Sequence, residues 1–283
     1  MAIAPQQLTL PPAVPQPPKD DYASMFNGMR GTPAEEIKAE ENLRIVILGQ
    51  PKTGKSWFAA TAPKPIAYYD FDRRASSLAG KAGVFVTTLF DSTVEKPTAM
   101  GDLEKELSMW QMKKAKGEPI PATFVLDSVT YMKQCMENEL MKQDASLSRI
   151  VRVGTGKMVK IPSGWDVINA VQRYLQYWVT EFSALGNIIL VFHERDEKDR
   201  DKSTLTETKY TGRVTVDPQY LDKILSQFNE VFRIEVDGQR KYTVSCRPNN
   251  NVLASTTLLI DAMEPPDLMA MLAKHKANKA KKL

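Results

Sequence analysis

Short apolar runs alternate with amphipathic segments along most of the chain. Largely apolar runs at 43–48, 65–72, 123–127 and 187–192 are typical of strands that are buried on both faces of a sheet. The segment 165–185 carries apolar residues at alternating steps of three and four, which predicts a long amphipathic helix. Strands that alternate with helices predict an α/β fold with a mostly parallel central sheet flanked by helices.

Weaker signals complete the order of elements. Apolar and polar residues alternate on either side of an Asp-Gly pair, which predicts a C-terminal β-hairpin over 231–246. Residues 148–164 are basic and contain glycine, residues 194–217 are highly charged, and both segments are predicted to be loops. The remaining expected elements are a strand at 84–89 and helices at 56–62, 101–116, 128–142, 222–229 and 266–282.

The first candidate for chemistry lies directly after the first predicted strand. Residues 49–56 fit the phosphate-binding P-loop pattern G-x-x-x-x-G-K-[ST]. Gly49 and Gly54 allow the backbone to bend and approach phosphate oxygens. Lys55 would reach the β- and γ-phosphates, and the hydroxyl of Ser56 would bind Mg²⁺. The alternative is a glycine turn with a solvated lysine. The expected nucleotide contacts are Gly49, Gln50, Lys52, Thr53, Gly54, Lys55 and Ser56.

Three further side chains follow other predicted strands and therefore share an edge of the sheet with the P-loop. Asp127 fits the carboxylate that holds Mg²⁺ in P-loop enzymes, although strands often end in Asp as a turn former. Asp72, in preference to Asp70, could polarise an attacking water; alternatively both acids form a solvated turn with neighbouring arginines. His193 could sense the γ-phosphate by donating a hydrogen bond, or it could be structural.

The two charged segments suggest nucleic acid. Residues 148–164 contain no acid, and a flexible basic segment can follow a phosphate backbone. The segment 194–212 mixes both signs of charge, which weakens the same argument there. Solvated surface loops are the alternative for both segments. The candidate DNA contacts are Arg149, Arg152, Lys157 and Lys160.

Composition excludes several classes of protein. The 42% hydrophobic and 25% charged content are ordinary for a soluble globular chain, and the net charge of +4 does not by itself imply nucleic acid. Two cysteines in unrelated contexts suit a reducing cytosol instead of a disulfide scaffold. Apolar runs are too short to span a membrane, and the N-terminus lacks the pattern of a secretory signal. We therefore expect a cytoplasmic protein that does not engage a membrane.

The order of motifs resembles the RecA-like P-loop ATPases, and most closely the phage-type members that act as single-strand annealing or recombination proteins. The resemblance rests on four segments and covers about 43–250. These segments are Gly49–Ser56, Tyr69–Asp72, Val125–Ser128 and Val191–Glu194. It implies a RecA-like core with an extra strand between the P-loop strand and the Asp127 strand. The domains expected are a proline-rich, disordered tail at 1–42, the ATPase domain at 43–262 and a basic helix or tail at 263–283.

The same resemblance implies a function. ATP and Mg²⁺ are the expected cofactors, and the catalytic residues would be Lys55, Asp72, Asp127 and His193. Asp72 stands where the family usually has a glutamate. Residues 148–164 and 194–217 correspond to the family's two mobile DNA-binding loops. The partners implied are single-stranded DNA, further copies of the chain in a filament or ring, and a single-stranded-DNA-binding protein. A phage-encoded protein would work in the cytoplasm of its bacterial host.

The expected function is ATP-dependent binding of single-stranded DNA that promotes annealing or strand exchange in phage recombination and repair. Two alternatives stay open. A small-molecule or nucleoside kinase would share the P-loop but would need an arginine-rich lid and an acceptor pocket. A DNA-binding accessory module would keep the fold and hydrolyse almost no ATP.

Overall fold

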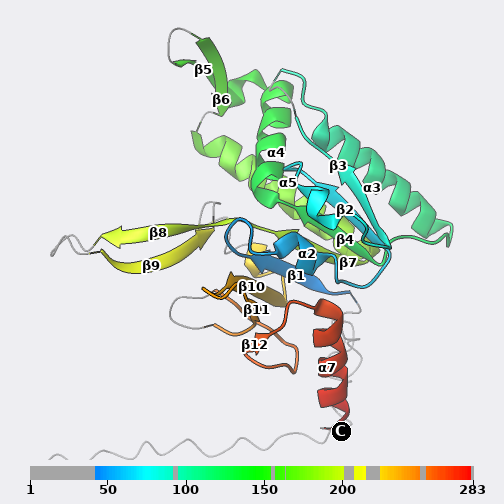
Figure 1. The fold of residues 1–283 in the computed structure, drawn as a ribbon. Helices are drawn as coiled ribbons and strands as arrows, with labels where there is room; N and C mark the ends of the chain where they lie inside the picture. The colour runs from blue at the N-terminus through cyan, green and yellow to red at the C-terminus, as the bar shows by residue number, and fades with distance from the viewer. Residues whose placement is uncertain are drawn as a thin grey trace, which may run out of the picture. The chain divides into compact units, whose positions relative to one another are not determined.

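The computed structural model describes residues 42–91, 95–153, 157–162, 164–200, 207–214, 224–248 and 253–281 (Figure 1). The chain divides into two compact units, 1–41 and 42–283. The predicted proline-rich tail falls in the first unit and lies outside the described residues, apart from residue 42.

Helices and strands follow the predicted order through most of the second unit. The strands are β1 (Arg44–Leu48), β2 (Ile66–Asp70), β3 (Val84–Thr88), β4 (Thr123–Asp127), β5 (Ser148–Val153), β6 (Lys157–Pro162), β7 (Asn187–Val191), β8 (Glu194–Arg200), β9 (Glu207–Val214), β10 (Glu230–Val236), β11 (Tyr242–Ser245) and β12 (Met263–Glu264). The helices are α2 (Lys55–Ala59), α3 (Ala99–Ala115), α4 (Val129–Gln143), α5 (Gly164–Leu185) and α7 (Leu268–Ala280), with short 3₁₀ turns η2 (Ala75–Leu78) and η3 (Ala145–Leu147).

Within the described residues, eight strands form one sheet in the order β12-β11-β10-β1-β7-β4-β2-β3. Every pairing from β10 to β3 is parallel, and β11 and β12 are antiparallel additions at one edge. The α/β prediction is therefore confirmed. β7 lies between β1 and β4, which is the extra strand that the resemblance implied. The sheet continues past residue 262, because β12 pairs with β11.

Alternate residues of each central strand enter two separate apolar clusters, because successive side chains of a strand point to opposite faces. Val46 and Leu48 of β1 belong to the first cluster, which α3, α4 and α5 cover (Figure 1). Ile45 and Ile47 belong to the second, which includes residues of α2 and α7. The central strands are thus buried on both faces, which explains why they read as continuous apolar runs.

The prediction that 148–164 and 194–217 are loops is wrong. Within 148–164, the strands Ser148–Val153 and Lys157–Pro162 pair antiparallel as β5–β6, and within 194–217, the strands Glu194–Arg200 and Glu207–Val214 pair antiparallel as β8–β9. The sequence Arg149–Val153 mixes charged with β-branched residues, and β-branched residues favour an extended strand. Charge and glycine are typical of loops, but a two-stranded ribbon exposed to solvent can carry both.

The C-terminal hairpin is confirmed, since β10 and β11 pair antiparallel around Asp237 and Gly238. Of the helix predicted at 222–229, residues 222 and 223 lie outside the described part, Ile224 and Leu225 are helical, and the chain then closes in i→i+3 turns up to Phe228. No described helix is long and apolar enough to cross a membrane.

Candidate active site

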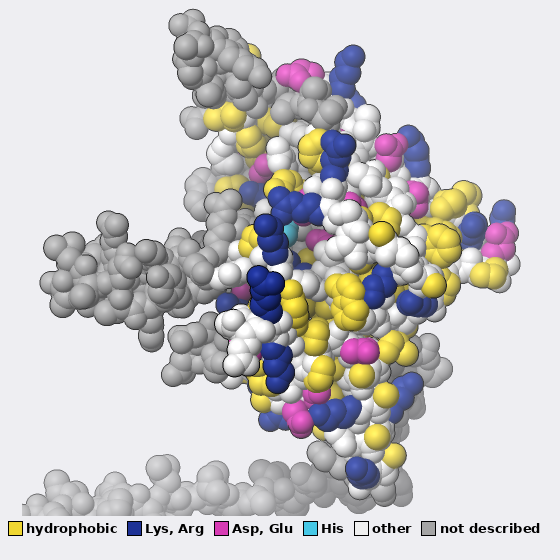
Figure 2. Space-filling view, in the orientation of Figure 1, with side chains coloured by type: hydrophobic (Ala, Val, Ile, Leu, Met, Phe, Trp, Pro, Cys, Tyr) yellow, Lys and Arg dark blue, Asp and Glu magenta, His cyan; other side chains and the backbone are white. Residues whose placement is uncertain are grey.

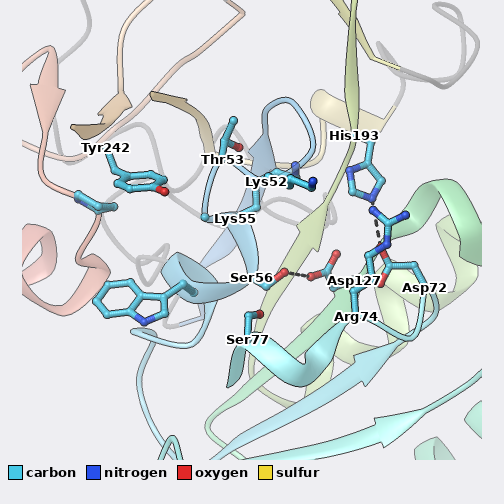
Figure 3. Close-up of a pocket in the computed structure, with 13 residues that line it drawn as sticks. Lys52, Thr53, Lys55, Ser56, Asp72, Arg74, Ser77, Asp127, His193 and Tyr242 are labelled. Atoms are coloured by element: carbon cyan, nitrogen blue, oxygen red, sulfur yellow. Dashed lines mark hydrogen bonds and ion pairs between the residues drawn. The ribbon is translucent and has the colours of Figure 1, made fainter. Parts of the chain in front are cut away.

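The carboxyl ends of β1, β2, β4 and β7 meet at one edge of the sheet, where the register places Asp70 beside Asp127 and Asp127 beside Val191. A pocket of about 850 Å³ opens there. Its lining residues are Lys52, Thr53, Gly54, Lys55, Ser56, Trp57, Asp72, Arg74, Ser77, Asp127, His193, Tyr242 and Pro266 (Figure 3). All four predicted catalytic residues are therefore brought together.

Two glycines shape the loop between β1 and α2. Gly49 has a φ of 154°, and a Cβ at this position would lie 2.8 Å from the carbonyl oxygen of Ile234 and 2.9 Å from the hydroxyl of Thr53. Gly54 has a φ of 85° and stands directly before α2. Any larger residue at Gly49 would force backbone apart, so the pattern read from the sequence is a steric requirement of this loop.

Lys55 lies under the loop with its side chain almost fully buried. Its ammonium donates to the carbonyl oxygens of Gly49 at 2.9 Å and Gln50 at 2.6 Å. Burial lowers the pKa of Lys55 to about 8, although the nearby carboxylates of Asp127 and Glu194 act in the opposite direction. The ammonium is therefore held at the loop by backbone acceptors that phosphate oxygens could replace.

Asp127 and Ser56 are in direct contact. The Ser56 hydroxyl donates to Oδ2 of Asp127 at 2.5 Å, and the hydroxyl of Tyr68 donates to the same oxygen. Burial raises the pKa of Asp127, while the hydrogen bonds from Ser56 and Tyr68 oppose the rise. Two hard oxygen donors side by side fit Mg²⁺, which in phosphate sites uses one or two protein ligands and takes the rest from water and phosphate.

Asp72 and His193 form a second contact in the pocket. Nε2 of His193 lies 3.4 Å from Oδ2 of Asp72, and Nε of Arg74 lies 3.8 Å from the same oxygen. Burial alone would raise the pKa of Asp72, but the contact with His193 and the charge of Arg74 hold it below its usual range. The rings of Tyr131 and His193 are nearly perpendicular, with their centroids 6.3 Å apart. Asp72 is thus kept as a carboxylate at the pocket wall.

Asp70 has a different task. Its carboxylate accepts hydrogen bonds from the backbone nitrogens of Asp72 and Arg74 at 3.2 Å, and of Ala75 at 2.9 Å. It does not line the pocket. The sequence favoured Asp72 over Asp70 as the acid that faces a ligand, and the geometry agrees: Asp70 organises the turn that carries Asp72.

Several lining residues were not predicted. The sequence suggested Arg74 only as an ion partner of the neighbouring acids. No sequence motif pointed to four further lining residues: Trp57, Ser77, Tyr242 and Pro266. Tyr68, which contacts Asp127 from the neighbouring strand, was not predicted either. A tyrosine hydroxyl in a strand buried on both faces was the one available signal. Gly49 and Gln50 shape the loop without lining the pocket, and Lys52, Thr53 and Gly54 line it as expected.

Lys and Arg side chains gather in a band on the face seen in Figure 2. Lys52 and Arg74 line the pocket and are both exposed. Such a rim attracts polyanions. The four candidate DNA contacts lie elsewhere, on β5 and β6, and the described lining of the pocket includes none of them.

A family model described as an AAA domain, AAA_24, matches residues 41–258. The chain belongs to this AAA-domain family. Together with the P-loop and the parallel sheet, this makes residues 41–258 of the chain an ATPase domain of the P-loop type. None of the curated proteins matches the sequence.

Among solved structures, the AAA domain is similar to EssC (ATPases 2 and 3) from Geobacillus thermodenitrificans, with 12% identity and a TM-score of 0.34. The match covers 78% of this chain and 34% of the other, so the protein spans about a third of EssC's length in that structure.

Proposed function

We propose that the protein hydrolyses ATP in this pocket and couples hydrolysis to the binding of single-stranded DNA, promoting annealing or strand exchange in phage recombination or repair. One observation supports the ATPase part best: the P-loop lysine and serine, two separate carboxylates and a histidine converge from four strand ends on one pocket. A nucleotide site needs the first two groups, and hydrolysis needs a further acid near the transferred phosphate.

Each residue has a separate role in this reaction. Lys55 would exchange its two backbone acceptors for oxygens of the β- and γ-phosphates. Ser56 and Asp127 would hold Mg²⁺, which neutralises phosphate charge when bound. Asp72, held as a carboxylate, would orient the attacking water and accept its proton. His193 keeps Asp72 in place at 3.4 Å and would report the state of the γ-phosphate.

The DNA part rests on charge and on one structural connection. The hairpin β5–β6 carries four basic residues within an acid-free segment. The hairpin β8–β9 begins at Glu194, whose backbone nitrogen donates to the carbonyl oxygen of Gly49 at 2.9 Å. The Glu194 carboxylate is buried and accepts from Nε of Arg233 at 2.8 Å. A change in the P-loop could therefore move the base of this hairpin, which is the coupling that the proposal needs.

The deciding experiment is the ATPase rate with and without single-stranded DNA, with Lys55→Ala as the inactive reference. Stimulation by DNA that disappears in Lys55→Ala supports the proposal. Phosphate transfer to an added nucleoside would indicate the kinase instead. Turnover no faster than that of Lys55→Ala would indicate an accessory module that binds DNA without hydrolysing ATP.

A second measurement addresses the basic hairpin. Replacing its four basic residues by Ala should weaken DNA binding and flatten the dependence of affinity on salt by up to about 3 in log–log slope, because each phosphate contact on a single strand contributes about 0.7. An unchanged slope would exclude this hairpin as the DNA contact. The matched control removes four exposed lysines outside the hairpin: Lys96, Lys105, Lys116 and Lys142.

A further inference from the structure

The pocket has two chemically different ends. Figure 3 shows Asp72, Arg74, Asp127 and His193 on one side of the P-loop and Tyr242 on the other. The charged end suits the γ-phosphate and the attacking water, because the acids that hydrolysis requires are there. A triphosphate oriented in this way leaves its nucleoside on the side of Tyr242.

Tyr242 is placed against the P-loop by the sheet. Ring carbons Cδ1 and Cε1 lie 3.4 and 3.5 Å from the position that a Cβ on Gly54 would occupy. The backbone of Tyr242 pairs with Val236 in the β10–β11 hairpin, and the carboxylate of Asp237 accepts from the backbone nitrogens of Gln239 and Lys241 to fix the turn. The ring is therefore held in position although 43% of the residue is exposed.

Two other apolar groups line the same pocket. Trp57 lines the pocket, is 44% exposed, and has the ammonium of Lys81 over its ring at 3.9 Å. Pro266, just before α7, lines the pocket as well. Large aromatic surfaces left exposed inside a pocket are suited to stacking on a flat ligand.

This end offers few groups that could distinguish one base from another. Both lining carboxylates, Asp72 and Asp127, belong to the charged end. Thr53 already donates its hydroxyl to the carbonyl oxygen of Gln50 at 2.9 Å. The described lining contains no Asn or Gln side chain. Stacking tolerates different bases because every base has a π-face, whereas discrimination requires hydrogen bonds to its edge.

Building on the proposed function, we propose that Tyr242 stacks on the nucleobase of the bound triphosphate, with Trp57 and Pro266 completing the wall, and that the site discriminates weakly between adenine and guanine. Tyr242 then contributes to affinity for nucleotides and not to affinity for the triphosphate chain. ATP and GTP should bind within about tenfold of each other, because stacking supplies most of the base's affinity.

The test compares binding of a non-hydrolysable ATP analogue, the matching GTP analogue and inorganic triphosphate to the full chain by calorimetry. Tyr242→Ala should weaken binding of both nucleotides about 10- to 100-fold. Its affinity for inorganic triphosphate should stay within about twofold of the wild-type affinity. Tyr242→Phe should restore most of the lost affinity, since the ring is kept. Tyr177→Ala, which removes an aromatic residue on α5 that is 41% exposed and outside the pocket, is the matched control.

Three results would overturn the inference. Equal losses for nucleotides and for inorganic triphosphate in Tyr242→Ala would mean that the ring supports the P-loop and not the base. Unchanged nucleotide affinity in Tyr242→Ala would contradict stacking on this ring. A wild-type preference for one purine nucleotide by far more than about tenfold would contradict the weak discrimination between bases. Failure of wild type to bind any of the three ligands would instead refute the proposed function itself.

Discussion

The hydroxyl of Tyr68 is the most informative single group to remove. It donates to Oδ2 of Asp127, the oxygen that also accepts from Ser56. Tyr68 is 1% exposed, so water cannot take the place of the lost donor without rearrangement. Tyr68→Phe keeps the ring, its packing and the β2 strand, and removes one oxygen atom. We expect it to loosen Asp127 and to weaken the site at which Mg²⁺ would be held.

The size of the effect follows from the contact. A buried hydrogen bond to a charged group contributes about 1.5–3 kcal/mol, and 1.4 kcal/mol corresponds to a factor of ten. Removing a group that orients a metal ligand commonly weakens metal binding or activity by about 10- to 100-fold. Both estimates lead to the same expectation: Tyr68→Phe should raise the Mg²⁺ concentration for half-maximal ATPase activity by about 10- to 100-fold.

The neighbouring residue offers a matched control. Tyr69 points to the opposite face of β2, is equally buried, and has its hydroxyl 3.0 Å from Nε1 of Trp110 and 3.3 Å from Glu106. Tyr69→Phe is therefore the same chemical change at the same depth, remote from the pocket. It should lower the free energy of unfolding by about 1 kcal/mol and leave the Mg²⁺ dependence unchanged.

The assay is ATPase rate against Mg²⁺ concentration at saturating ATP, with urea unfolding measured for each variant. Identical Mg²⁺ dependence in Tyr68→Phe and wild type would refute the reasoning, because Asp127 would then either not hold the ion or not need the tyrosine. Equal shifts in both variants would attribute the effect to the strand and not to the contact with Asp127.

Three other measurements follow from the structure. Asp72→Asn should lower kcat by about 10²–10⁴-fold at similar KM, since it removes the base; an unchanged kcat would make this acid structural. Arg233→Met should cost about 3–5 kcal/mol in urea unfolding because it leaves the Glu194 carboxylate buried and unpaired, and adding Glu194→Leu should recover most of that loss; a double variant that is no more stable would contradict this. Burial raises the pKa of the Cys135 and Cys246 thiols to about 12, so iodoacetamide should label native protein far more slowly than urea-unfolded protein; equal rates would contradict their burial.

Sequence reasoning worked where structure depends on neighbouring residues. A strand buried on both faces must be apolar throughout, so β1, β4 and β7 were visible as runs. The P-loop was visible because its constraints act within eight residues. The hairpins β5–β6 and β8–β9 were missed because charged residues that alternate along an extended ribbon have the same composition as a solvated loop.

The other residues at the site depend on contacts between distant segments. Tyr242 reaches Gly54 only because β10 pairs with β1 and β11 pairs with β10. Likewise, Tyr68 meets Asp127 because β2 and β4 are adjacent in the sheet. A contact between residues of two different strands cannot be predicted from the sequence pattern of either strand alone. The roles of Asp72 and His193, and the DNA contacts of Arg149, Arg152, Lys157 and Lys160, stay predictions.

The position of Lys55 has a consequence for how quickly and how tightly a nucleotide can bind. Its ammonium has already lost most of its hydration during folding, as its lowered pKa reflects. An arriving phosphate therefore meets a cation that has little water to lose, and it displaces the carbonyl oxygens of Gly49 and Gln50 from the ammonium. The free-energy cost of dehydrating the Lys55 ammonium is met during folding and lowers the stability of the empty protein. The loop is then preorganised for an anion.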